Sequence, residues 1–213
     1  MSSNLTRITI HPMSNKYIEV ISKYISNKRV QHCIRVSETA VRLAKIHGAN
    51  TSLVQKAGLL HDIAKNQTPT SMLAIGIDVS EFDDCWEQYP SVWHAFVGPK
   101  LILYEFQDEP DEIDTMVRYH TTGYPDMNLE TAIIFIADFI EPERSHARRL
   151  EIANIAEKNV NVAVAWITYE SIQKLKSKKV AIHPNTQACW ESYCKYGVNG
   201  EEWHTNADTE DSR

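Results

Sequence analysis

The sequence predicts an all-α fold, and two observations lead to that prediction. Apolar residues recur three and four positions apart along most of the chain, which is the spacing of a helix buried on one face. Gly is scarce, at 7 of 213 residues. Because no linker or internal repeat divides the chain, one domain is expected. We place it at 15–196, between an N-terminal arm at 1–14 and a polar tail at 197–213 that is expected to be disordered.

Composition excludes several classes of function. The chain is 43% hydrophobic and 23% charged, as in an ordinary globular protein. Its formal net charge of -6 gives no general basic field for nucleic acid, so phosphate must be bound at a local site. No run approaches the roughly 20 apolar residues that cross a bilayer, and the N-terminus has no apolar signal core. The Cys residues lack disulfide-scaffold spacing, which indicates reduced thiols in a cytoplasmic protein.

Caps and breakers divide the first half of the chain into helices. Gly48 provides a C-cap and Asn50 an N-cap between two amphipathic segments. Pro69, preceded by a Thr, begins a short helix. Gly98 and Pro99 predict a kink or a late start in the helix that contains them. Helices are expected at 15–26, 32–47, 51–65, 69–76 and 94–106, with an acidic, aromatic loop containing some helical turns at 77–90.

The second half of the chain contains the most apolar helix. Its apolar run includes Asp138 and is stopped by Pro142. A long helical segment follows, with a break expected near Asn159, and Pro184 opens the last helix. Helices are expected at 113–120, 129–140, 148–179 and 184–195.

Six polar side chains lie on or beside the apolar stripes of these helices. Burying an imidazole or a carboxylate without partners costs a few kcal/mol or more. A metal centre would satisfy all of them together, because in helical di-metal proteins the ligands project from facing helices into the bundle. Zinc, iron and manganese accept both imidazole nitrogen and carboxylate oxygen. The six residues are His32, His61, Asp62, His94, His120 and Asp138.

Each of these residues, taken alone, could have an ordinary structural role instead of binding a metal. A single His of this kind is more often a hydrogen-bonded core or surface residue. Six such residues in one helical core are harder to explain in that way. The set contains no Cys, which argues against a structural zinc site. We therefore expect two ions, one held by His32, His61, Asp62 and Asp138 and a second held by His94 and His120, with Asp62 bridging.

Several short motifs surround these residues. They are Arg29-x-x-His32, Leu-Leu-His61-Asp62-x-Ala-Lys65, His94 followed by Gly98, His120-Thr-x-Gly123, Ala-Asp138-x-Ile-Glu-Pro-x-Arg144 and Pro184-x-Thr186. Their order resembles that of the HD-domain metal-dependent phosphohydrolase superfamily. The finer matches resemble its YqeK group, the bacterial symmetrical diadenosine-tetraphosphate (Ap4A) hydrolases. The resemblance spans about residues 16–194, and Pro99 departs from it, because the group more often has a small residue there.

This resemblance implies a fold, a cofactor and a reaction. The fold would be an HD-type helical bundle with the metal centre between its helices. The cofactor would be a di-iron centre, with manganese, zinc or magnesium as alternatives. The reaction would be cleavage of Ap4A into two ADP by a metal-bound hydroxide, since two metals about 3.5–4 Å apart lower the pKa of a shared water and clamp an in-line displacement at phosphorus. A homodimer is compatible with the resemblance, and no nucleic-acid or membrane partner is expected.

Basic residues near the expected ligands are candidates for handling phosphate. Lys65 lies one turn beyond His61, and Arg144 follows the helix of Asp138. Either could neutralise charge on the phosphoryl oxygens or hold the leaving ADP, so both join Asp62 in the expected catalytic set. The alternative for each is a solvated surface cation.

Lys65 and Arg144 are expected to contact the substrate, and so are three further residues. Arg29 precedes the first ligand by three positions and could reach the same region. Thr121 and Gly123 could place backbone N–H groups against a phosphate. Aromatic side chains of the loop 77–90 and Trp93 could stack on adenine, although such a cluster is more often the core of its loop.

Three rival functions stay open at this point. Two are other HD-type nucleotide phosphohydrolases, a 5′-nucleotidase or a cyclic-nucleotide phosphodiesterase. The third is a nucleotide-sensing HD module without turnover. Retention of His32, His61, Asp62 and Asp138 argues against the sensor, because a sensor can dispense with the metal.

Overall fold

The computed structural model describes residues 12–197, with side chains from residue 15 on. Of the arm expected at 1–14, residues 12–14 begin a helix instead, and the rest lies outside the described residues. The tail expected at 197–213 lies outside them from residue 198 on. No described residue lies in a strand, which confirms the all-α prediction. The helices are α1 Pro12–Ile21, α2 Asn27–His47, α3 Thr51–Leu60, α4 Pro69–Ala74, η1 Ser80–Phe82, α5 Asp83–Gln88, α6 Pro90–Phe106, α7 Asp111–Tyr119, α8 Leu129–Ile140, α9 Arg149–Lys158, α10 Val160–Ser177, α11 Pro184–Tyr193 and η2 Cys194–Tyr196.

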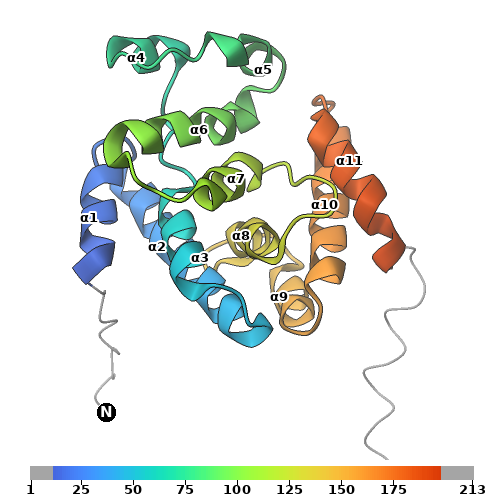
Figure 1. Ribbon diagram of the computed structural model, residues 1–213. Helices are drawn as coiled ribbons and strands as arrows, with labels where there is room; N and C mark the ends of the chain where they lie inside the picture. Colours follow the sequence, from blue (N-terminus) through green and yellow to red (C-terminus); the bar gives the residue numbers. More distant parts are fainter. Residues whose placement is uncertain (1–11, 198–213) are drawn as a thin grey trace, which may run out of the picture.

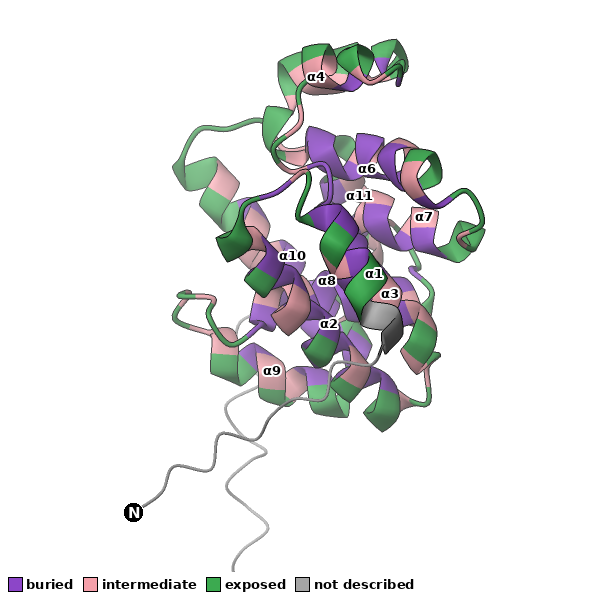
Figure 2. Ribbon diagram, turned by 90° about the vertical axis from the view of Figure 1, so that its left-hand side faces the viewer, coloured by how far each residue is buried: buried purple, intermediate pink, exposed green. Residues whose placement is uncertain are grey.

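The apolar helix α8 forms the centre of the molecule. It packs against α2, α3, α7, α9 and α10, and Figure 1 shows it end-on between them. Most of its residues are buried, as the purple ribbon in Figure 2 shows. A helix that is apolar on nearly every side is stable only in such a position. A polar group in the middle or the last turn of α8, such as Asp138, is therefore brought towards the interior.

Helices α2 and α3 approach each other closely at Gly58. A Cβ atom on this residue would lie 2.6 Å from the Cα of Ser37 and 2.9 Å from its backbone nitrogen. Gly permits this approach because it has no side chain. The contact fixes the C-terminal end of α3 against α2.

Three predicted boundaries near the expected ligands are wrong, and the reasons are local. Helix α2 begins at Asn27 instead of residue 32, because the Ser26 side chain accepts from the Arg29 N–H and caps the helix there. Helix α3 ends at Leu60 instead of residue 65, and the chain continues in tight i→i+3 turns over 61–66. Helix α6 does not start late: Pro90 occupies its first position, and the helix continues past Pro99. Pro is favourable at a first helical position, where its missing N–H would have no intrahelical acceptor.

Helix α1 also differs from the prediction, because it spans Pro12–Ile21 instead of residues 15–26. The later elements agree with the sequence. The expected break near Asn159 separates α9 from α10, and the segment 77–90 contains two short helices, η1 and α5. With α4 they form a layer outside α6, at the top of Figure 1. The four Cys residues are free thiols. Within residues 12–197, no helix has the length and apolar character needed to cross a membrane.

Candidate metal centre

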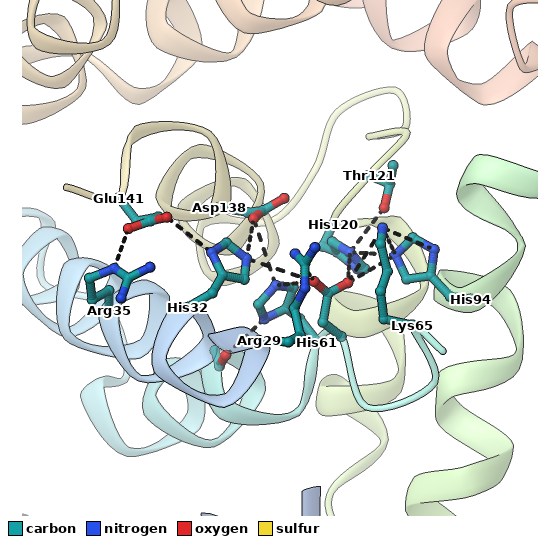
Figure 3. Close-up of polar contacts among 12 residues, drawn as sticks. Arg29, His32, Arg35, His61, Lys65, His94, His120, Thr121, Asp138 and Glu141 are labelled. Carbon is teal, nitrogen blue, oxygen red and sulfur yellow. Dashed lines mark hydrogen bonds and ion pairs between the residues drawn. The ribbon is translucent and has the colours of Figure 1, made fainter. Parts of the chain in front are cut away.

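The six polar residues singled out in the sequence meet at one place between the helices (Figure 3). Five of them are at most 5% exposed, and Asp138 is half-buried. They come from five helices or their ends. The sources are α2 for His32, the end of α3 for His61 and Asp62, α6 for His94, the end of α7 for His120, and α8 for Asp138.

The Asp62 carboxylate lies between two groups of imidazoles. Its Oδ2 is 3.7 Å from His32 Nε2 and 3.5 Å from His61 Nε2. Its Oδ1 is 3.0 Å from His94 Nε2 and 3.6 Å from His120 Nε2. The two oxygens therefore face different pairs of nitrogens, which is the arrangement of a bridging carboxylate.

Asp138 completes the first group from the opposite side. Its Oδ1 lies 3.0 Å from His32 Nε2 and 3.7 Å from His61 Nε2. Ligand atoms of three residues come within 4.8 Å of one another in three combinations. These are His32 with His61 and Asp62, His94 with His120 and Asp62, and a crossing set of His61, His120 and Asp138.

Three of the four imidazoles are held in one tautomer by an oxygen on the outer side of the ring. His61 Nδ1 lies 2.8 Å from the Gly58 carbonyl, and His120 Nδ1 lies 2.7 Å from the Val117 carbonyl. His32 Nδ1 lies 3.1 Å from Glu141 Oε1. Since these oxygens can only accept, each Nδ1 carries the proton and donates it. Each Nε2 then presents a lone pair to the centre, as metal-ligating His residues do.

Buried polar atoms without hydrogen-bond partners provide a test of metal binding. Of the six such side-chain atoms among the described residues, three belong to this cluster: His32 Nε2, His61 Nε2 and Asp62 Oδ1. Buried polar atoms normally have a partner, and leaving one unpaired costs about 1–3 kcal/mol. A divalent cation between them would satisfy all three. The donor set therefore fits a metal ion.

Burial and mutual contact also set the charge state that a metal requires. Burial lowers the pKa of His61 to about 3 and that of His94 to about 4. Burial alone would raise the pKa of Asp62, but the imidazoles of His61, His120 and His94 around it hold it well below its usual value. At neutral pH these two imidazoles are thus neutral and this carboxylate ionised, which are the forms that bind metals.

The three cations expected near the ligands all contact them. Arg29 Nη1 lies 2.8 Å from Asp62 Oδ2. Lys65 Nζ lies 3.2 Å from His94 Nε2 and 3.8 Å from Asp62 Oδ1. Arg144 donates to Asp138 through Nη2 and also through Nε, which is 2.7 Å from the backbone oxygen. Each side chain is 31–35% exposed, so the three reach from the surface to the centre.

Thr121 and Gly123, the two residues expected to offer N–H groups to the substrate, have different surroundings in the turn after α7. Thr121 lies at the centre, with its hydroxyl 2.9 Å from His120 Nε2. The Gly123 N–H donates to the Tyr119 carbonyl at 2.8 Å and closes the turn, and its contact with the substrate stays a prediction. Its φ of +62° and the Sγ of Cys189, 2.6 Å from where a Cβ would lie, explain why a Gly occupies this turn.

Within the aromatic cluster, Trp93 is a core residue and not a side chain free to stack on adenine. This side chain is 1% exposed and packs edge-on against Trp86, with ring centroids 5.0 Å apart. A ring so deeply buried has no face free for a base.

Sequence reasoning missed Glu141, which touches the centre, and Arg35, which contacts Glu141. Glu141 is 2% exposed and accepts from the ring of His32, and Arg35 Nε lies 2.6 Å from Glu141 Oε2. The available signal was their spacing, because Arg35 follows His32 by three positions and Glu141 follows Asp138 by three. Three positions place side chains on one helix face.

Comparison with known proteins identifies the family. The family model of the HD domain matches residues 29–143, which include all six clustered residues. The chain belongs to the HD domain family. This confirms the resemblance seen in the sequence.

Similar HD-domain proteins cover most of this chain. The symmetrical bis(5′-nucleosyl)-tetraphosphatase of Halalkalibacterium halodurans is 30% identical over 175 residues, or 82% of this chain and 94% of that protein. The protein of the same name from Bacillus subtilis is 30% identical over 166 residues, or 78% and 89%. The crystal structure of a predicted HD superfamily hydrolase involved in NAD metabolism from Clostridium acetobutylicum has a TM-score of 0.76 at 26% identity, covering 86% of this chain and 98% of that one.

Proposed function

We propose that this HD-domain protein is a metal-dependent hydrolase that cleaves Ap4A symmetrically into two ADP. The observation that carries the proposal is the Asp62 carboxylate, whose two oxygens face two pairs of imidazole nitrogens at 3.0–3.7 Å. The substrate comes from the relatives, several of which are named symmetrical bis(5′-nucleosyl)-tetraphosphatases.

The clustered residues would hold two cations. We assign His32, His61 and Asp138 to the first and His94 and His120 to the second, with Asp62 shared. When bound, two such ions lower the pKa of a shared water and neutralise charge at phosphorus. We propose iron as the resident metal, because imidazole and carboxylate donors without Cys suit it. Manganese, zinc and magnesium are the alternatives that elemental analysis distinguishes.

The cations around the centre would bind the polyphosphate. Arg29, Lys65 and Arg144 surround the two aspartates and are partly exposed, so a phosphate chain arriving from solvent would meet them first. Charge-assisted hydrogen bonds from such groups stabilise phosphoryl oxygens as their charge grows. The Thr121 hydroxyl adds a neutral donor on the His120 side.

The described residues beyond the family match support a single domain over 15–196. Helix α1 packs on α3, and α11 packs on α10, so both flanking segments join the same body. We place the protein in the cytoplasm, where free thiols such as its four Cys residues persist.

Product analysis tests the proposal. Purified protein loaded with Fe²⁺ without oxygen is expected to convert Ap4A to ADP as the sole nucleotide product. AMP together with ATP would contradict symmetrical cleavage. Nucleoside and phosphate released from mononucleotides instead would favour a 5′-nucleotidase, and turnover of a cyclic nucleotide would favour a phosphodiesterase. Binding of Ap4A without turnover by the iron-loaded protein would favour a sensor.

Replacing Arg144 by Ala is expected to lower kcat/KM for Ap4A while the metal content stays unchanged. The guanidinium contacts Asp138 but is not itself a ligand, so its loss removes a positive charge from the phosphate site and leaves all six candidate ligand side chains present. One charge-assisted hydrogen bond is worth about 1.5–3 kcal/mol, or roughly tenfold to a hundredfold. Steady-state kinetics with elemental analysis measures both quantities.

Arg42→Ala is the matched control, since Arg42 forms an exposed ion pair with Glu157. It should leave kcat/KM at the wild-type value. Unchanged kinetics in Arg144→Ala would show that this residue is an ordinary surface cation.

A further inference from the structure

Glu141 is a buried carboxylate that no step of the proposed function uses. It is 2% exposed, and both of its oxygens have partners. Oε1 lies 3.1 Å from His32 Nδ1, and Oε2 lies 2.6 Å from Arg35 Nε and 2.9 Å from the backbone nitrogen of Glu143. Burial alone would raise the pKa of this carboxyl, but these donors lower it, so Glu141 is ionised at neutral pH.

The end of α8 therefore contacts both nitrogens of a single ring. Asp138 Oδ1 lies 3.0 Å from His32 Nε2, and Glu141 Oε1 lies on the other side of the same imidazole (Figure 3). Asp138 lies in the last turn of α8, and Glu141 is the C-cap residue three positions on, just as His32 and Arg35 are three apart on α2. Since residues three apart share a helix face, one turn of α2 and the C-terminal end of α8 build the whole arrangement.

His32 differs from the other three imidazoles in the group behind its ring. His61 and His120 donate to neutral backbone carbonyls. His94 Nδ1 has no oxygen partner among the described residues, and Lys65 Nζ lies 3.5 Å from it. A carboxylate behind a ligating His raises the basicity of the nitrogen that faces the metal.

We propose that Glu141, itself held by Arg35, is a positioning residue that fixes the tautomer and orientation of His32 and thereby sets the affinity of the ion bound there. The inference rests on the metal centre of the proposed function but not on its substrate. It predicts an effect on one of two ions, because Glu141 contacts only His32 among the clustered residues.

The experiment is a titration of the metal-stripped full-length protein with Mn²⁺, followed by calorimetry and by the electron paramagnetic resonance of bound Mn²⁺. The variants are Glu141→Ala, Glu141→Gln and Arg35→Gln. Loss of an outer-shell partner typically weakens metal binding about 10- to 100-fold. We expect Glu141→Ala to weaken one Mn²⁺ site by this factor and to leave the other at its wild-type affinity.

The Gln variant separates positioning from packing. Its amide oxygen can still accept from His32 while its charge is lost, so its effect should be smaller than that of Ala. Arg35→Gln should weaken the same site, because it frees the carboxylate to move. The matched controls are Glu143→Gln, an exposed residue two positions away, and Arg42→Gln, an exposed Arg on the same helix as Arg35. Both should bind Mn²⁺ as the wild type does.

Two results would overturn the proposal. One is unchanged affinity at both sites in Glu141→Ala and Glu141→Gln. The other is equal weakening at both sites together with a lower melting temperature, which would make Glu141 a merely structural link between α2 and α8. Ap4A turnover is scored separately: a wild-type protein that binds two Mn²⁺ but releases no ADP with any metal would reject the proposed substrate, and the metal affinities alone would then decide the role of Glu141.

Discussion

Replacing Asp62 by Ala is expected to remove both metal ions and to abolish Ap4A hydrolysis. Among the described residues, Asp62 is the side chain that faces both pairs of imidazoles, one pair with each oxygen. Metal activation contributes several kcal/mol to such reactions, and each 1.36 kcal/mol is a factor of ten in rate, so activity should fall by at least about a thousandfold. Elemental analysis and ADP release measure the two losses.

The variant Asp62→Asn tests whether charge or shape matters. It keeps the volume and one oxygen of the side chain but removes the negative charge that offsets two cations. We expect it to lose at least one ion and most of the activity, while circular dichroism reports the same helical content as the wild type. An Asp62→Ala protein with full metal occupancy would show that the carboxylate does not bridge.

The fold was largely accessible from the sequence because its helices are amphipathic and well capped. Asn50 accepts a hydrogen bond from the Leu53 N–H at the start of α3, and this cap was visible in the sequence. The cap at Ser26 was not recognised, so the start of α2 was placed five residues late. The end of α3 was not visible. There the side chain of His61 donates to the Gly58 carbonyl, so the chain tightens into a turn instead of extending the helix to residue 65.

The candidate ligands were also accessible from the sequence, because polar residues in apolar stripes are conspicuous. The residues that contact these ligands from outside the centre were harder to predict from the sequence. Glu141 lies just past the apolar run of α8, where an acid normally reads as a solvated helix end, and only the packing of α8 on α2 brings it to His32. The close contact at Gly123 was also hidden, because the Cys189 Sγ that would meet a Cβ there lies far along the chain.

Replacing Gly58 by Ala is expected to destabilise the protein and to weaken metal binding together. The new Cβ would meet the backbone of α2 at 2.6 and 2.9 Å, and backbone cannot move aside as the tip of a side chain can. Overpacking typically costs about 1–3 kcal/mol, and the upper end applies to a backbone clash. The higher helix propensity of Ala relative to Gly offsets about 1 kcal/mol of this cost. A net loss of about 2 kcal/mol corresponds to a fall in melting temperature of roughly 4–8 °C for a protein of this size.

The link to the metal centre is the Gly58 carbonyl, which holds His61 Nδ1 at 2.8 Å. If α3 shifts away from α2 to relieve the clash, that carbonyl moves, and His61 moves relative to His32 on α2. Thermal melts with and without Mn²⁺ measure both effects, and the stabilisation that Mn²⁺ gives should be smaller in the variant. Ser52→Ala, an exposed substitution on the same helix, should leave both quantities near wild type. A Gly58→Ala protein as stable as the wild type would mean that α2 and α3 are not packed at backbone contact, and the placement of His61 against His32 would lose its structural basis.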